Sequence, residues 1–288
     1  MSKLMTFHKF LPGCEVGDRH SWGIFLSNYT PMALQLCNLY LPFPPDARKA
    51  FWRDVLLALW ANDHERLRGF PQQAEREFLV GLRAFIFDLA LPMLDPSSDS
   101  TAPPRPTVET LGELLKGLPF LHQETIFLKL AGYSNATLEE MLGIAPTVAE
   151  RGLERLRSGY AAVFEKPDDK CLWPASWLEI TRLARAARQP ACAPLRQLVR
   201  ILDGQTSWYE KTPIEEHMGG CLSCLEQWTA LREVVFWLRE VKPLPFEKIA
   251  PMLSSLPFRE DTQQGKSFLA RMLGKWRFQD SVVSGKGS

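Results

Sequence analysis

Glu216-His217-Met-Gly-Gly-Cys221-Leu-Ser-Cys224 is the segment of this 288-residue chain that decides how its C-terminal half is expected to fold. On one continuous helix, the His-x3-Cys-x2-Cys spacing places an imidazole and two thiols within roughly 40° of one another. These groups supply three of the four ligands of a tetrahedral site, and zinc is the metal that most readily takes such a set. The segment therefore predicts a helix start that holds a metal ion.

Cys192, upstream of this segment, is the candidate for the fourth ligand, with Cys171 as its substitute. A set of Cys192, His217, Cys221 and Cys224 would leave no open coordination position, so we expect structural rather than catalytic Zn²⁺. The alternative is that the three cysteines are reduced thiols of a core, because free cysteine is among the most buried residue types. His217 would then be an exposed residue at a helix start.

The composition is that of an ordinary globular chain, with 45% hydrophobic and 23% charged residues and a formal net charge of +1. No global basic field indicates nucleic acid, so any DNA contact requires a local patch. The N-terminus lacks the features of a signal peptide, and the most apolar run, 78–94, contains Arg83, Asp88 and Pro92. We expect a cytoplasmic protein with no membrane partner. In such a protein, clustered Cys and His indicate metal binding rather than disulfides.

Apolar residues recur at helical spacing along the chain, and alternating β-branched runs are nearly absent, which predicts an all-α fold. Residues 95–107 (Asp-Pro-Ser-Ser-Asp-Ser-Thr-Ala-Pro-Pro-Arg-Pro-Thr) form a predicted linker in which nothing could bury a face. The predicted domains are helical segments at 1–94, 108–165 and 166–241, the last interrupted near Gly204 and Pro213. A Pro-containing tail, 242–288, carries a terminal amphipathic helix near 265–278. No nucleophile elbow, phosphate loop or dinucleotide fingerprint is present, so we do not expect an enzyme.

The middle segment predicts a helix-turn-helix. Leu118-Pro119 opens a first helix, and Ser134 can cap the next one. Gly143 ends that short helix, and Pro146 starts a last helix that runs to about Tyr160. In a helix-turn-helix, the second helix of the motif enters the major groove of DNA.

Four groups of residues in this segment resemble the promoter-reading domain of bacterial extracytoplasmic-function sigma factors of the sigma-70 family: Leu118-Pro119, Gly132-Tyr133-Ser134, Leu142-Gly143-Ile144 and Leu153-x-Arg155-x-Arg157. Before the linker, Trp22-x2-Phe25-Leu26-x2-Tyr29, Asp46-Ala47 and Leu57-Ala58-Leu59-Trp60 resemble the family's N-terminal helical domain. The resemblance implies two helical domains on a linker that bind the RNA polymerase core and promoter DNA. It also implies DNA contacts by the arginines of the last helix: Arg151, Arg155 and Arg157.

A solvated helix face is the alternative for these arginines, because Glu150 and Glu154 leave the helix an excess of only one positive charge. In the C-terminal half, Leu198-Val-Arg-Ile-Leu-Asp203-Gly204 followed by the His-x3-Cys-x2-Cys segment resembles the zinc-containing anti-sigma fold. The resemblance implies a fused regulator that binds its own sigma-like domains in cis. The alternative function is a degenerate sigma-like adaptor, an anti-sigma or partner-sequestering module without promoter recognition.

Overall fold

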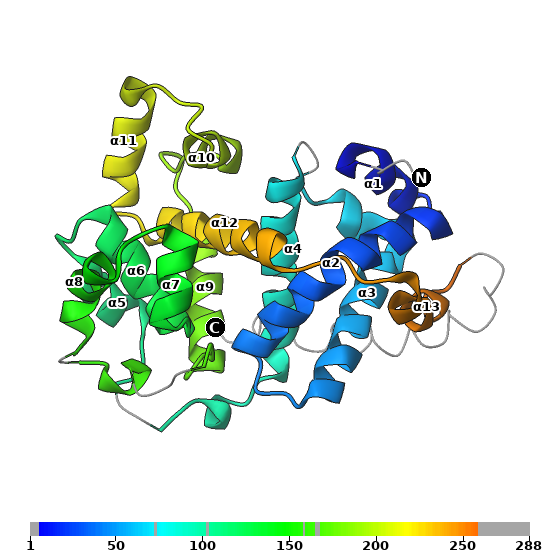
Figure 1. Ribbon diagram of the computed structural model, residues 1–288, viewed down its shortest axis with the longest axis horizontal. Helices are drawn as coiled ribbons and strands as arrows, with labels where there is room; N and C mark the ends of the chain where they lie inside the picture. The colour runs from blue at the N-terminus through cyan, green and yellow to red at the C-terminus, as the bar shows by residue number, and fades with distance from the viewer. Residues whose placement is uncertain (1–5, 72–73, 102–103, 158, 165–167, 259–288) are drawn as a thin grey trace, which may run out of the picture. The chain divides into compact units, whose positions relative to one another are not determined.

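A computed structural model describes residues 6–71, 74–101, 104–157, 159–164 and 168–258 (Figure 1). These residues form helices, turns and loops and contain no strand, which confirms the all-α prediction. The predicted terminal helix near 265–278 lies outside the described residues. The α-helices are α1 (Phe7–Glu15), α2 (Arg19–Tyr40), α3 (Pro45–Arg68), α4 (Glu75–Ala90), α5 (Val108–Leu115), α6 (Phe120–Ala131), α7 (Asn135–Leu142), α8 (Pro146–Arg157), α9 (Pro174–Ala186), α10 (Leu195–Leu202), α11 (Trp208–Met218), α12 (Leu222–Glu240) and α13 (Phe246–Ser254). Short 3₁₀ helices are η1 (Leu91–Met93), η2 (Pro96–Ser98) and η3 (Ala161–Phe164).

The chain divides into two compact units whose boundaries differ from the predicted domains. The first unit draws on residues 1–30, 50–70 and 243–288, and the second on 31–49 and 71–242. The predicted linker and the predicted second and third domains therefore belong to one unit. Contacts between residues distant in sequence produce this division, and neither periodicity nor composition reports such contacts.

The first unit has a core of aromatic side chains from α2 and α3. Trp22, Phe25 and Tyr29 repeat at helical spacing and are fully buried, as their periodicity predicts. The indole Nε1 of Trp52 donates a hydrogen bond of 3.1 Å to Thr30 Oγ1, so the polar edge of this buried ring is satisfied. These contacts hold the first half of α2 against the middle of α3.

In the second unit, α12 carries two buried carboxylates, Glu226 and Glu233, which both pair with Arg83 of α4. Glu233 also accepts hydrogen bonds from the hydroxyls of Tyr40, at 2.6 Å, and Tyr133. Because an unpaired buried charge is very costly, these groups require one another's presence. The network thus joins α12 to α2, α4 and the segment that follows α6.

The predicted linker is anchored at Asp99, whose side chain is buried although the sequence predicts no buried face in this segment. The carboxylate of Asp99 accepts hydrogen bonds from the backbone N–H groups of Ala175, at 2.8 Å, and Ser176, at 3.1 Å. These donors lie in the first turn of α9, where backbone N–H groups have no partner within the helix. Asp99 therefore caps a helix that begins 75 residues later in the numbering, at Pro174.

The helix-turn-helix segment folds as α6, α7 and α8, with the predicted signals at its turns confirmed. Ser134 Oγ accepts a hydrogen bond of 3.3 Å from the backbone N–H of Thr137, and Gly143 ends α7 with φ +64°. Gly132 ends α6 with φ +112°, and a Cβ there would lie only 2.4 Å from the backbone N of Cys171. The predicted interruption at Pro213 is wrong, because this proline lies inside α11.

Candidate metal centre

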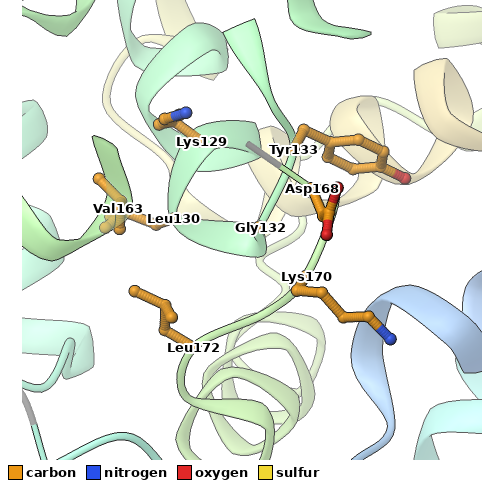
Figure 2. A pocket seen from close by; sticks show the side chains of 8 residues that line it. All are labelled: Lys129, Leu130, Gly132, Tyr133, Val163, Asp168, Lys170 and Leu172. Atoms are coloured by element: carbon orange, nitrogen blue, oxygen red, sulfur yellow. The ribbon is translucent and has the colours of Figure 1, made fainter. Parts of the chain in front are cut away.

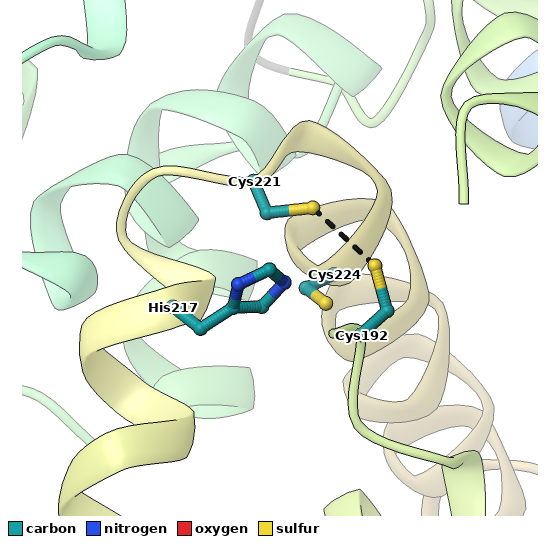
Figure 3. A group of neighbouring side chains, drawn as sticks. All are labelled: Cys192, His217, Cys221 and Cys224. Atoms are coloured by element: carbon teal, nitrogen blue, oxygen red, sulfur yellow. Dashed lines mark hydrogen bonds between the residues drawn. The ribbon is translucent and has the colours of Figure 1, made fainter. Parts of the chain in front are cut away.

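The structure brings together all four predicted ligands: Cys192, His217, Cys221 and Cys224 (Figure 3). One ligand atom from each residue can be chosen so that all four atoms lie within 4.8 Å of one another. The Sγ atoms of Cys192 and Cys221 are 3.6 Å apart. Two ligands at about 2.3 Å from a tetrahedral zinc would place their sulfur atoms about 3.8 Å apart, so this spacing fits. The cluster could therefore hold a metal ion.

The elements that carry these ligands correct one part of the sequence interpretation. His217 is the penultimate residue of α11, whereas Cys221 is the N-cap of α12 and Cys224 lies in the first turn of that helix. The three side chains therefore converge from two helices instead of lining one helical face. The helix breaks at Gly219-Gly220, since glycine loses more conformational freedom on becoming helical than any other residue.

The imidazole of His217 gives independent support for a ligand at this position. Its Nε2 is buried and has no hydrogen-bond partner among the residues that the structure describes. Figure 3 shows the ring directed at the thiols of Cys192 and Cys224. A buried polar atom without a partner is costly, and a cation bound among the thiols would satisfy it.

The thiols influence one another's protonation. Burial raises the pKa of Cys192, but the backbone N–H of Gln189 and contacts with His217 and the other thiols outweigh this effect and lower it to about 7. Burial, reinforced by Cys192 and Cys221, raises the pKa of Cys224 to about 12. Without a cation, the cluster therefore favours one thiolate and opposes further ones. A bound divalent cation reverses this preference, because a coordinating thiol is deprotonated.

A site with four protein ligands has a structural role, because no position remains for water or substrate. The helix that carries His217 has little core of its own, because Met218 is the only buried residue of α11. Bound metal would therefore supply stability that apolar packing supplies elsewhere, by linking the segment before α10 to α11 and α12.

Cys171, the substitute ligand, is not a member of the cluster; its backbone N–H donates instead to Leu39 O at 2.9 Å. Cys37 shows what a core thiol, the alternative for the clustered cysteines, looks like in this chain. Its thiol is deeply buried, and burial raises its pKa to about 12. Within the described part of the chain, Cys37 belongs to no group of potential metal ligands. The contrast favours metal binding at the cluster.

Two supporting contacts have no signal in the sequence. The backbone N–H of Gln189 donates a hydrogen bond of 3.3 Å to Cys192 Sγ, which orients that thiol. The side-chain Nε2 of Gln123, on α6, donates a hydrogen bond of 2.8 Å to the backbone carbonyl of Gly219. The second contact fixes the turn between His217 and Cys221. Neither could be inferred from spacing, because each depends on how the chain packs.

The predicted DNA-binding arginines of α8 have different environments. Arg155 donates hydrogen bonds to the carbonyl oxygens of Leu114, at 3.0 Å, and Lys116, at 2.8 Å, at the end of α5. Arg157 lies 3.8 Å from a carboxylate oxygen of Glu154 and has its guanidinium over the ring of Phe164. The side chain of Arg151 is exposed. The three arginines are therefore not an equivalent set directed at one surface.

A small space beside Gly132, away from the candidate metal centre, is too small for a ligand other than water. It is lined by residues including Lys129 and Lys170 and has a volume of about 10 Å³ (Figure 2). A space of this size accommodates a single water molecule at most.

Comparisons of the chain with protein-family models, curated proteins and solved structures found no match. Within the described part of the chain, no helix combines the length and the apolar character needed to cross a membrane. The metal-ligand cluster is therefore the feature on which a functional argument can be built.

Proposed function

We propose that the chain is a sigma-like transcription regulator in which a zinc-clipped helix pair acts in cis on the helix-turn-helix segment. The observation that carries this proposal is the hydrogen bond from Gln123 Nε2, on α6, to Gly219 O, in the turn between two metal ligands. The sequence resemblances to sigma factors and to zinc anti-sigma domains support the assignment of roles. The partners are the RNA polymerase core, promoter DNA and the chain's own sigma-like segments.

The regulatory contact has a second part along α12. Glu124, on α6, is buried and accepts hydrogen bonds of 2.9 Å from Trp228 Nε1 and from Arg232 Nε. Zinc at the start of α12 would fix the turn that Gln123 contacts. Loss of the zinc would therefore weaken the contacts that this turn and α12 make with α6. Because both parts belong to one chain, their effective concentration is high, and weak contacts suffice to maintain the closed state.

The second candidate function is an adaptor that binds a protein partner without reading DNA. The hydrogen bonds of Arg155 to α5 favour it, because an arginine that caps a neighbouring helix is not free to neutralise a phosphate. Salt dependence separates the two functions. A DNA reader loses affinity steeply as salt rises, whereas an adaptor has no DNA binding to lose.

The test uses the full chain, because a fragment ending near residue 170 would remove Glu233 from Tyr40, Arg83 and Tyr133. Zinc-loaded and chelator-treated protein would each be tested for binding to core RNA polymerase, with zinc quantified in the same samples. Binding to double-stranded DNA would be measured at two salt concentrations. The regulator requires polymerase binding that increases on zinc removal and DNA binding that weakens with salt. Polymerase binding without DNA binding supports the adaptor, and no polymerase binding in either state overturns the regulator.

A further inference from the structure

The first unit contains an open groove between the first half of α2 and α13, with a volume of about 970 Å³. Its apolar lining comes from Ile24 on α2 and from Leu244, Ile249 and Leu253 on the C-terminal segment. Phe246 borders the same groove with 65% of its surface exposed. The backbone holds the two sides together, because Leu244 N donates to Ser27 O at 2.9 Å and Ser27 Oγ donates to Leu244 O at 2.7 Å.

Gly23 keeps this groove open. It lies inside α2 and lines the groove, at a position where glycine makes the helix less stable than alanine would. A Cβ at this position would meet a single neighbour, Leu253 Cδ2 at 3.9 Å. Close helix packing therefore does not require the glycine. A larger side chain would instead occupy the space above it.

Positive charge gathers on the side of the groove near the start of α2. Lys9 and Arg19 line this region, and the Arg19 guanidinium lies 5.1 Å from the ring centroid of Phe258. Asp18 also lines the groove, and its carboxylate is occupied by hydrogen bonds from the backbone N, at 2.8 Å, and Oγ, at 2.6 Å, of Ser21 in the first turn of α2. The cations of Lys9 and Arg19 therefore face one carboxylate, which leaves an excess of positive charge in this region.

We propose that this groove binds a medium-chain fatty acid such as dodecanoate, with its carboxylate near Lys9 and Arg19 and its acyl chain along Ile24, Ile249 and Leu253. The groove has the volume of a small-molecule site, and its cations adjoin an apolar surface, as an anionic amphiphile requires. Each methylene that leaves water favours binding, so the alkyl chain of dodecanoate can drive binding even when it is partly covered. This site is separate from the metal centre and does not depend on the proposed function.

The test is calorimetric titration of the full chain with dodecanoate, below its micelle concentration, beside dodecanol and dodecyltrimethylammonium. We expect dodecanoate to bind at least tenfold more tightly than the ammonium compound. Gly23→Leu should abolish binding by filling the groove, whereas Gly23→Ala, the matched control, should retain it. Both substitutions raise helix propensity, so α2 should form in each. Phe246→Ala, at an exposed residue, provides a second variant, and we expect it to weaken dodecanoate binding threefold or more.

Arg19→Gln should weaken dodecanoate binding about tenfold and leave dodecanol binding unchanged. Equal affinity for all three amphiphiles would overturn the proposal, because it would show an apolar surface without charge selection. Absence of binding, or binding that survives both Gly23→Leu and Phe246→Ala, would also overturn it. Binding seen only after deletion of residues 259–288 would mean that the chain's own tail occupies the groove, contrary to the proposal.

Discussion

The side-chain amide of Gln123 donates a hydrogen bond of 2.8 Å to the carbonyl of Gly219, and a second of 2.9 Å to Leu118 O. One buried side chain therefore links the start of α6 to the turn of the candidate metal centre. The contact relates two segments that the sequence places nearly 100 residues apart.

Gln123→Met, which keeps the side chain's length and removes its donors, should lower the free energy of unfolding by about 1–3 kcal/mol. It leaves two carbonyls with one partner fewer and frees the Gly219 turn, so metal should also dissociate faster. Chemical denaturation and transfer of metal to a chelator measure these effects. Gln205→Met, at an exposed position, is the control and should change neither quantity. An unchanged metal-transfer rate in Gln123→Met would disprove the coupling.

The purified chain should bind one Zn²⁺, and metal removal should lower its thermal unfolding temperature because binding energy becomes folding energy. Cys192→Ser should weaken zinc binding by at least tenfold, whereas Cys171→Ser, outside the cluster, should bind zinc as tightly as the parent chain. Metal analysis and competition with a chelator give the stoichiometry and affinity. Equal zinc affinity in the two variants would refute the ligand assignment.

Arg83→Met should destabilise the second unit by about 3–5 kcal/mol, since it leaves Glu233 buried without its cation and Glu226 with Arg185 alone, at 3.6 Å. Arg182→Met is the matched control: its ion pair with Glu179 is exposed, and such pairs contribute at most about 1 kcal/mol. Urea denaturation followed by far-UV circular dichroism compares the two variants. A loss below about 1 kcal/mol for Arg83→Met would contradict the described network.

Arg155→Ala should lower stability by about 1 kcal/mol, because the end of α5 loses two hydrogen bonds. Arg151→Ala, at an exposed position of the same helix, should leave stability unchanged. If α8 contacts DNA, the Arg151 variant should reduce the salt dependence of binding by about one phosphate contact. Similar stability losses in both variants would argue against the capping role of Arg155.

We expect the stability of the first unit to depend on pH because of His64. It is buried, neither ring nitrogen has a hydrogen-bond partner among the described residues, and burial lowers its pKa in the folded state below the usual 6.5. The unfolded chain therefore takes up the proton first as pH falls. Stability from this source is complete above about pH 6.5 and decreases as pH falls toward the folded-state pKa. In denaturation series from pH 7.5 to 5, the free energy of unfolding of His64→Leu should fall less than that of the parent chain. If the free energy of unfolding depended on pH equally in both, His64 would not be the source of the pH dependence.

The sequence supplied the local features of the fold. Ser134 and Gly143 bound α7 as predicted, because capping by a hydroxyl and a left-handed C-cap depend on residues within one helical turn. The ligand set was also predictable, since His217, Cys221 and Cys224 lie within eight residues and metal chemistry selects these side chains. The break at Gly219-Gly220 was missed, although the glycine pair itself signals weak helix propensity.

Sequence alone thus determined an all-helical chain and the residues that could hold a metal ion, because helical periodicity and ligand chemistry are local properties. Tertiary structure decided that Arg83 pairs with Glu233, that Asp99 caps α9 and that Arg155 donates hydrogen bonds to the end of α5. These partners are separated by long stretches of chain, and a charged residue does not specify which distant partner it will meet. Burial makes the choice, because a charge removed from water must be paired wherever packing places it.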